Sequence, residues 1–78
     1  MTKIERINRR EANSDNTLVF IKQYWKDHGL GPAYRDIEFA VGISAGSAVI
    51  SVDTLVERGL VSVLPGVARS IKPVKKGK

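Results

Sequence analysis

The side chains that could do enzymatic or metal chemistry are few and scattered. The 78-residue chain has no cysteine and a single histidine, His28, so it cannot form a thiolate site or a histidine cluster for a metal ion. Asp36 and Glu38 could suggest an acid–base pair, but residues two apart on a helix point in different directions, and neither a nucleophile nor a phosphate-binding loop accompanies them. We therefore expect a protein that is not an enzyme and uses no cofactor or metal. His28 is interpreted as a cation that favours a helix C-terminus.

Basic residues near the two ends of the chain suggest a different chemistry, the binding of a polyanion. The formal net charge of +5 is unevenly distributed, because residues 1–13 contribute +2, residues 14–60 contribute −2 and residues 61–78 contribute +5. Such an asymmetry indicates basic ends that meet a polyanion, most often nucleic acid. A tail that only raises solubility explains the charge equally well.

The length and the apolar pattern predict one small domain over residues 14–73, between a flexible basic arm at 1–13 and a basic tail at 74–78. We expect three helices, over residues 15–28, 33–41 and 46–58. Ser14 and Asp15 can cap the first, Pro32 precedes the second and Ser44 can cap the third.

The expected core combines one face of each helix with the segment that follows the third helix. In the third helix, the spacing of Ala48, Val52, Leu55 and Val56 predicts a buried stripe. Including the other elements, we expect the core to contain Leu18, Ile21, Trp25, Ile37, Val41, Ile43, Ala48, Val52, Leu55, Leu60, Val61 and Ile71.

The segment after the third helix has the composition of a β-hairpin. "LVSVL" (60–64) and "ARSIKPV" (68–74) are short and rich in Val and Ile, and the turn pair Pro65-Gly66 separates them. Helix, helix, turn, helix and hairpin is the order of a winged helix-turn-helix. The sequence therefore predicts an α+β fold of three helices followed by a two-stranded β-hairpin wing.

The run "GLGPAYRDIEFAVGISAGSAVISVDTLVERGLV", followed by "GVARSIKP", resembles the N-terminal DNA-binding domain of LexA-type repressors over roughly residues 14–73. The resemblance implies sequence-specific operator binding and transcriptional repression. It also implies that the third helix reads bases, that Arg35 and residues 44–47 lie near the DNA backbone or groove edge, and that the wing touches phosphates. LexA-type repressors continue into a self-cleaving protease domain that also dimerises. This sequence ends at Lys78, so we expect a free-standing small regulator or dimerisation by other means.

The expected partner is double-stranded DNA, bound as a possible homodimer. The third helix has no Lys or Arg on its outer face to contact guanine, so Ser and Thr hydroxyls and the apolar Val49 and Ile50 would read bases weakly, while basic residues hold phosphates. The residues expected to contact DNA are Arg35, Ser44, Ala45, Gly46, Ser47, Val49, Ile50, Ser51, Thr54, Arg69, Lys72, Lys75 and Lys76.

Two alternatives from other classes remain open. The same fold could be a protein-interaction module that uses Val49, Ile50 and Phe39, or the chain could bind nucleic acid nonspecifically through charge alone. Phe39 stands where the LexA-type family usually shows a polar residue. We expect a one-residue shift or a rotation of the second helix that buries Phe39 and releases Glu38. The other possibility is that Phe39 is an exposed contact for a partner protein. Without a long apolar stretch or a signal peptide, we expect a cytoplasmic, nucleoid-associated protein that does not use a membrane.

Overall fold

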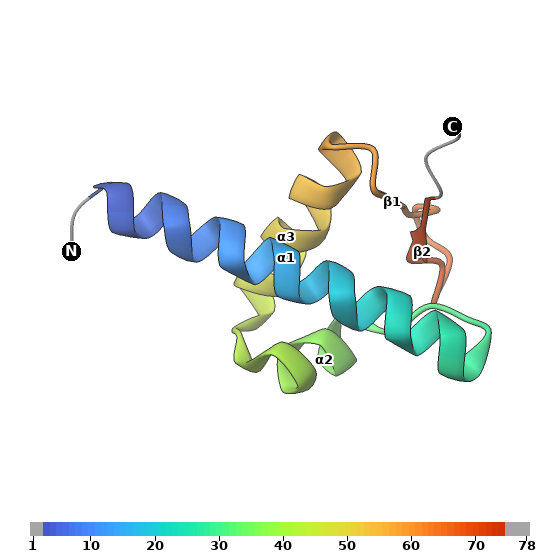
Figure 1. Ribbon diagram of the computed structural model, residues 1–78. Helices are drawn as coiled ribbons and strands as arrows, with labels where there is room; N and C mark the ends of the chain where they lie inside the picture. The colour runs from blue at the N-terminus through green and yellow to red at the C-terminus, as the bar shows by residue number, and fades with distance from the viewer. Residues whose placement is uncertain (1–2, 75–78) are drawn as a thin grey trace.

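Three helical segments are followed by a two-stranded hairpin, as expected for an α+β winged-helix layout. The computed structural model describes the backbone of residues 3–74 and the side chains of residues 12–74. The elements are α1 (Lys3–His28), α2 (Tyr34–Ile37), the π-helical turn η1 (Glu38–Gly42) that continues α2, α3 (Ala45–Glu57), β1 (Val61–Ser62) and β2 (Lys72–Pro73). Helix α1 crosses the molecule and packs against α3, η1 and β2 (Figure 1). The fold class predicted from the sequence is confirmed.

Helix α1 begins much earlier than predicted. It starts at Lys3 instead of near residue 15, so residues 3–13, expected as a flexible arm, are helical, while residues 1 and 2 lie outside the described part. Segment 3–13 has no Gly or Pro and is rich in strong helix formers, which explains the extension. Ser14 and Asp15 are therefore not helix caps. Ser14 lies in the middle of α1 and its side chain is buried in the fold. The carboxylate of Asp15 lies 3.9 Å from the guanidinium of Arg58, the residue that follows α3.

The core predicted from the sequence is confirmed. Ile21, Ile37, Ala48, Val52, Leu55, Val61 and Ile71 are buried, and Leu18, Trp25, Val41, Ile43 and Leu60 pack against them, together with Phe20 and Val63.

Val56 was expected in the buried stripe of α3 and is 42% exposed. Eight residues after Ala48, it has turned by roughly 80° around the helix axis, out of the buried arc of α3. Ser51 takes a place in that arc instead, only 2% exposed.

The second helix widens into a π turn over its last five residues. The N–H of Ile43 donates to the carbonyl oxygen of Glu38 at 3.2 Å, and Gly42 ends the turn with a φ of +77°. Phe39 is 83% exposed and Glu38 is half-buried, so the expected burial of Phe39 is wrong. Two residues correspond to about 200° of rotation, which places Phe39 opposite the buried Ile37.

The hairpin is shorter than predicted. Only Val61 with Pro73 and Ser62 with Lys72 pair in antiparallel register, rather than residues 60–64 with 68–74. Arg69 has a φ of +57°, which interrupts an extended strand, and Pro73 has no N–H to donate. The Ser70 hydroxyl closes the loop at Leu64, accepting from its N–H at 3.0 Å and donating to its carbonyl oxygen at 3.1 Å.

Within the described residues, no single helix is both long and apolar enough to cross a membrane. The helices Tyr34–Gly42 and Ala45–Glu57 reach the required length and apolar composition only when they are taken together, and the chain bends sharply between them.

Candidate nucleic-acid interface

Helix α3 and the segment before it form a helix-turn-helix. The Tyr34–Gly42 and Ala45–Glu57 helices meet at 103°. This angle lies within the range of about 90–120° that is typical of the motif. The turn holds because Gly42 adopts a left-handed conformation and because Ser44 caps α3, its Oγ accepting from the N–H of Ser47 at 3.2 Å. The cap predicted at Ser44 is confirmed, and α3 begins within one residue of the expected position.

The N-terminal half of α3 is open to solvent and carries little side-chain bulk. Ala45 and Gly46 are exposed, and an added Cβ at Gly46 would meet no other atom within 4 Å. Val49 and Ile50 are 42% and 47% exposed one turn further on. Small residues followed by apolar ones allow close approach to a flat or grooved partner surface.

The hydroxyls predicted to read bases are partly used within α3. Ser47 is half-buried and its Oγ accepts from the Oγ of Ser44 at 3.1 Å. The Thr54 hydroxyl donates to the carbonyl oxygen of Ile50 at 2.8 Å. Each of these oxygens keeps acceptor capacity, because a hydroxyl has two lone pairs.

Ser51 does not belong to this surface. It was expected to contact DNA, but it is buried, with only 2% of its surface exposed. The assignment of Ser51 as a base contact is therefore wrong.

The outer face of α3 carries acidic groups and no cation. Asp53 and Glu57 are exposed on the C-terminal half of the helix. Burial, and to a smaller extent the negative charge of Asp53, raise the pKa of the Tyr34 phenol at the start of α2. Tyr34 therefore remains a neutral hydroxyl at physiological pH, beside a helix that repels phosphates along its second half.

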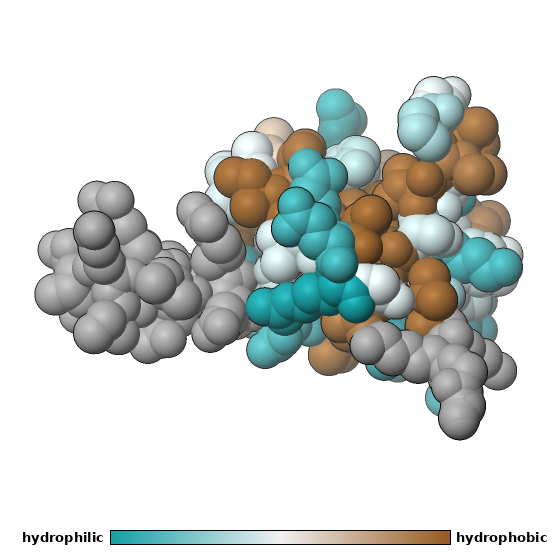
Figure 2. Space-filling model, turned by 90° about the horizontal axis from the view of Figure 1, so that it is seen from above, coloured by the Kyte–Doolittle hydropathy of each residue, from teal (hydrophilic) through white to brown (hydrophobic). Residues whose placement is uncertain are grey.

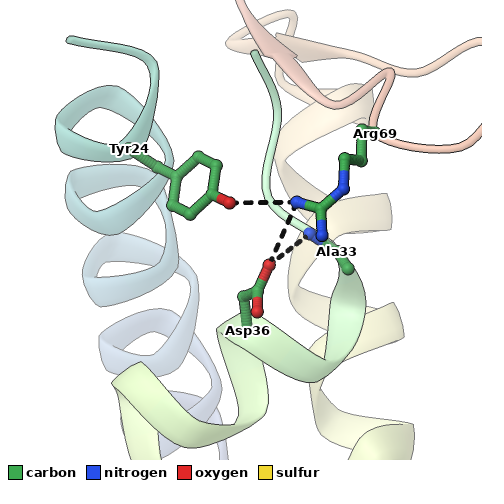
Figure 3. A network of polar contacts seen from close by, with 4 residues as sticks. All are labelled: Tyr24, Ala33, Asp36 and Arg69. Atoms are coloured by element: carbon green, nitrogen blue, oxygen red, sulfur yellow. Dashed lines mark hydrogen bonds and ion pairs between the residues drawn. The ribbon is translucent and has the colours of Figure 1, made fainter. Parts of the chain in front are cut away.

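Arg69, expected to hold a phosphate, forms a network at the base of the wing. Its Nη1 donates to the hydroxyl of Tyr24 at 2.9 Å and lies 3.5 Å from Oδ2 of Asp36, which also accepts from the N–H of Ala33 at 2.9 Å (Figure 3). These residues come from α1, from the start of α2 and from the hairpin loop. Arg69 thus ties the wing to the two helices, although its guanidinium stays half-exposed.

Of the other basic residues predicted to contact DNA, Arg35 and Lys72 are exposed. Arg35 lies at the second position of α2, and Lys72 lies in β2 with its ammonium 5.8 Å from the centre of the Trp25 ring. Lys75 and Lys76 lie outside the described residues. The side chains of residues 12–74 include six basic and six acidic groups, so the whole excess of +5 belongs to residues 1–11 and 75–78.

The wing loop is apolar at its exposed end. Leu64 and Val67 flank the Pro65-Gly66 turn and are both largely exposed. Apolar surface reaches the outside on the hairpin side of the molecule, at the right of Figure 2. The tip of the loop, residues 64–67, has no charge with which to bind a phosphate. Any charged phosphate contact of the described wing must therefore come from Arg69 or Lys72.

Sequence reasoning missed two residues that position the wing. Tyr24 and Asp36 were not expected to hold Arg69, and no local pattern indicates that residues 24, 36 and 69 meet.

Among the described residues, no group of three or more His, Asp or Glu side chains is placed to hold a metal ion.

No family model matches this sequence. No curated protein sequence matches it significantly.

Proposed function

We propose that this chain is a small DNA-binding transcriptional regulator that inserts the N-terminal half of α3 into the major groove. The observation that carries the proposal is the 103° angle between the two helices of the helix-turn-helix, with a capped and exposed start of α3. A major groove about 12 Å wide admits one helix presented in this way. The resemblance of the sequence to the DNA-binding domain of LexA-type repressors supports the same function.

The charges dictate how α3 would enter the groove. Asp53 and Glu57 repel phosphates along the second half of the helix, so residues 45–50 make the base contacts. Ala45 and Gly46 let the backbone come close to the base edges, and Val49 and Ile50 suit thymine methyl groups. Base discrimination is modest in this arrangement, because α3 has no Arg or Lys for a bidentate contact with guanine.

Affinity comes from outside α3. Arg35 and Lys72 are exposed and basic, and the ends of the chain, residues 1–11 and 75–78, carry the net positive charge. Cations that contact phosphates displace condensed counterions and give affinity that falls steeply with salt. Arg69 contributes by holding the wing in place rather than by offering a free charge.

A selection of duplexes from a random pool, followed by titration over a range of salt, tests the proposal. We expect enrichment of a preferred A·T-containing site, and we expect Ile50→Ala to reduce the preference for that site while random DNA is bound as before. Val67→Ala, which shortens an exposed apolar residue of the wing loop, is the matched control. Binding of all duplexes alike would identify a nonspecific binder, and failure to bind any duplex would refute the proposal.

A protein-interaction module is the second candidate, and the outer face of α3 favours it specifically. Val49 and Ile50 are exposed beside Asp53 on a face without cations, which suits an apolar and basic protein surface. The same titration separates the two functions, because this module would bind no duplex.

A further inference from the structure

A partly open pocket lies between the second half of α1 and the hairpin. Three segments line this α1–hairpin pocket: α1 through Lys22 and Trp25, the chain after α3 through Leu60 and Ser62, and the C-terminal arm of the hairpin through Lys72, Pro73 and Val74. Its volume is about 970 Å³, at the upper end of the range of about 300–1,000 Å³ that is typical of small-molecule sites. None of residues 45–50 at the start of α3 lines it.

Hydrogen bonds hold the apolar wall of the pocket in place. The indole Nε1–H of Trp25 donates to the carbonyl oxygen of Ile71 at 2.6 Å, which fixes the orientation of the ring. The N–H of Val74 donates to the carbonyl oxygen of Leu60 at 2.9 Å, so the two arms of the hairpin are joined where they line the pocket. A wall fixed in this way loses little conformational freedom when a ligand binds.

Two lysines add positive charge to this wall. Lys22 and Lys72 line the pocket, and no acidic residue lines it. Both lysines are exposed, and neither forms a salt bridge within residues 12–74. Because that part of the chain contains six basic and six acidic groups in total, two cations without an acid at one pocket are a local concentration of charge. The complementary ligand is therefore an anion.

The positive charge of Lys72 lies directly beside aromatic surface. Its Nζ is 5.8 Å from the centre of the Trp25 ring, within the distance of about 6 Å over which a cation and an aromatic face attract each other. A ligand group bound to this ammonium therefore lies close to the indole ring. The pocket thus offers a cation and an apolar surface at the same place.

We propose that the α1–hairpin pocket binds a small amphipathic anion, a carboxylate with an aromatic or aliphatic body. The carboxylate pairs with the ammonium groups of Lys22 and Lys72, and the body packs on Trp25, Leu60 and Val74. The ion pairs orient the ligand, while burial of its apolar body supplies most of the affinity.

The combination of charge and apolar surface selects against other ligands. A neutral apolar molecule would cover the two ammonium groups without offering a counter-charge, and removing a charged group from water without a partner is costly. A nucleic-acid strand carries a charge at every phosphate, so it would bring charge against Leu60, Pro73 and Val74, where no cation compensates it. An anion with one charged end and an apolar body avoids both costs.

The single tryptophan of the chain is a natural reporter of binding, because it lines the pocket. Titration of the full chain with phenylbutyrate, which has one carboxylate and an aromatic body, should change the fluorescence of Trp25 saturably, with a dissociation constant on the order of 1 mM. In NMR spectra, the indole N–H signal and the amide signals of Leu60, Ser62 and Lys72 should shift, and those of residues 45–50 should not.

Two matched compounds separate the contributions of charge and apolar body. Phenylbutyramide keeps the apolar body without the charge, and butyrate keeps the charge without the ring. We expect phenylbutyramide to bind about fivefold more weakly than phenylbutyrate, because it loses partly exposed ion pairs. Butyrate should bind more than about tenfold more weakly, because it buries far less apolar surface.

Matched lysine variants test the two proposed ion pairs. Lys22→Gln and Lys72→Gln should each weaken the binding of phenylbutyrate about two- to fivefold, and the double variant should weaken it further. Lys26→Gln is the matched control, because Lys26 is also an exposed lysine of α1 but does not line the pocket. It should leave the affinity unchanged, and all of these variants should melt at the temperature of the parent chain.

Several outcomes would overturn the proposal. A chain that gives no saturable response to phenylbutyrate has no such site, and shifts that map to α3 or η1 instead would place the ligand on another surface. Equal affinity for phenylbutyramide, or equal weakening by Lys26→Gln, would show that the two lysines do not recognise the carboxylate. An acidic peptide or an oligothymidylate that shifts the indole signal where phenylbutyrate does not would identify a macromolecule as the occupant. None of these measurements needs duplex DNA, so they succeed or fail independently of the proposed DNA binding.

Discussion

The indole Nε1–H of Trp25 donates a hydrogen bond of 2.6 Å to the carbonyl oxygen of Ile71. The preceding residue of α1, Tyr24, accepts from the guanidinium of Arg69. Two consecutive helical residues therefore hold the C-terminal arm of the hairpin from one side. The orientation of the wing relative to α1 depends on these side-chain bonds, because the two strands pair over only two residues each.

Replacing Trp25 with Phe should loosen the wing. The variant leaves the Ile71 carbonyl without its donor and removes part of a packed ring, so we expect the free energy of unfolding to fall by about 1–3 kcal/mol. Urea denaturation measures the loss, and hydrogen exchange should show faster exchange at Val74, whose N–H bonds the Leu60 carbonyl. Tyr24→Phe removes only one partly exposed hydroxyl and should cost less. Equal stability of Trp25→Phe and the parent chain would show that the indole bond does not hold the wing.

Gly31→Ala and Gly46→Ala should have opposite effects. A Cβ at Gly31 would collide with the backbone of Ile71 and Arg69, which passes directly over it, so this variant should unfold or displace the wing. A Cβ at Gly46 meets open space on α3 and should stabilise the protein by up to about 1 kcal/mol through helix propensity. Thermal melts of the two variants provide the comparison. A Gly31→Ala protein as stable as the parent would contradict the close backbone contact.

The phenol of Tyr34 should titrate above its ordinary pKa of about 10. Because the pKa is raised in the folded state, the unfolded chain releases this proton first. The associated stability is complete below about pH 10 and is lost as the pH rises through the folded-state pKa. NMR titration of the tyrosine ring in Asp53→Asn should show a lower pKa than in the parent, yet still above the ordinary value, because burial is the larger cause. A pKa unchanged by Asp53→Asn would mean that the carboxylate exerts no field on Tyr34.

Removing the basic tail should weaken all duplexes alike. Replacing Lys75, Lys76 and Lys78 with Ala should lower the slope of log affinity against log salt by about 0.9 for each phosphate that the tail no longer neutralises. The matched variant with Arg at all three positions keeps the charge and should keep the slope. A loss confined to one preferred sequence would indicate that the tail reads bases, contrary to this expectation.

Ser47→Ala and Ser51→Ala should separate a surface hydroxyl from a buried one. Ser47 lies in the exposed first turn of α3, and its replacement should reduce binding slightly and only at the preferred sequence. Ser51 is buried against the core, so Ser51→Ala should leave base preference unchanged and alter only stability. Competition between preferred and random duplexes measures both effects. A change of preference in Ser51→Ala would require α3 to rotate on binding.

The sequence by itself determined the order of the elements and the composition of the core. The apolar spacing identified all twelve predicted core residues, because a helix or strand that buries one face repeats apolar side chains with its own period. Capping chemistry located the start of α3 at Ser44, since the side chain that satisfies the first N–H groups is local in sequence. These features depend on residues a few positions apart, and such residues can be compared directly in the sequence.

Tertiary structure alone decided which borderline residues are buried and what the wing residues contact. Ser51 lies inside and Val56 outside because the buried arc of α3 depends on how the other elements pack against it, which periodicity does not specify to within one residue. Phe39 is exposed because it lies on the side of η1 that faces away from the core. Arg69 meets Asp36 and Tyr24 because three segments that are distant in the sequence converge where the wing joins the helices. These outcomes depend on contacts between residues far apart in the chain, and such contacts exist only once the helices and the hairpin are packed together.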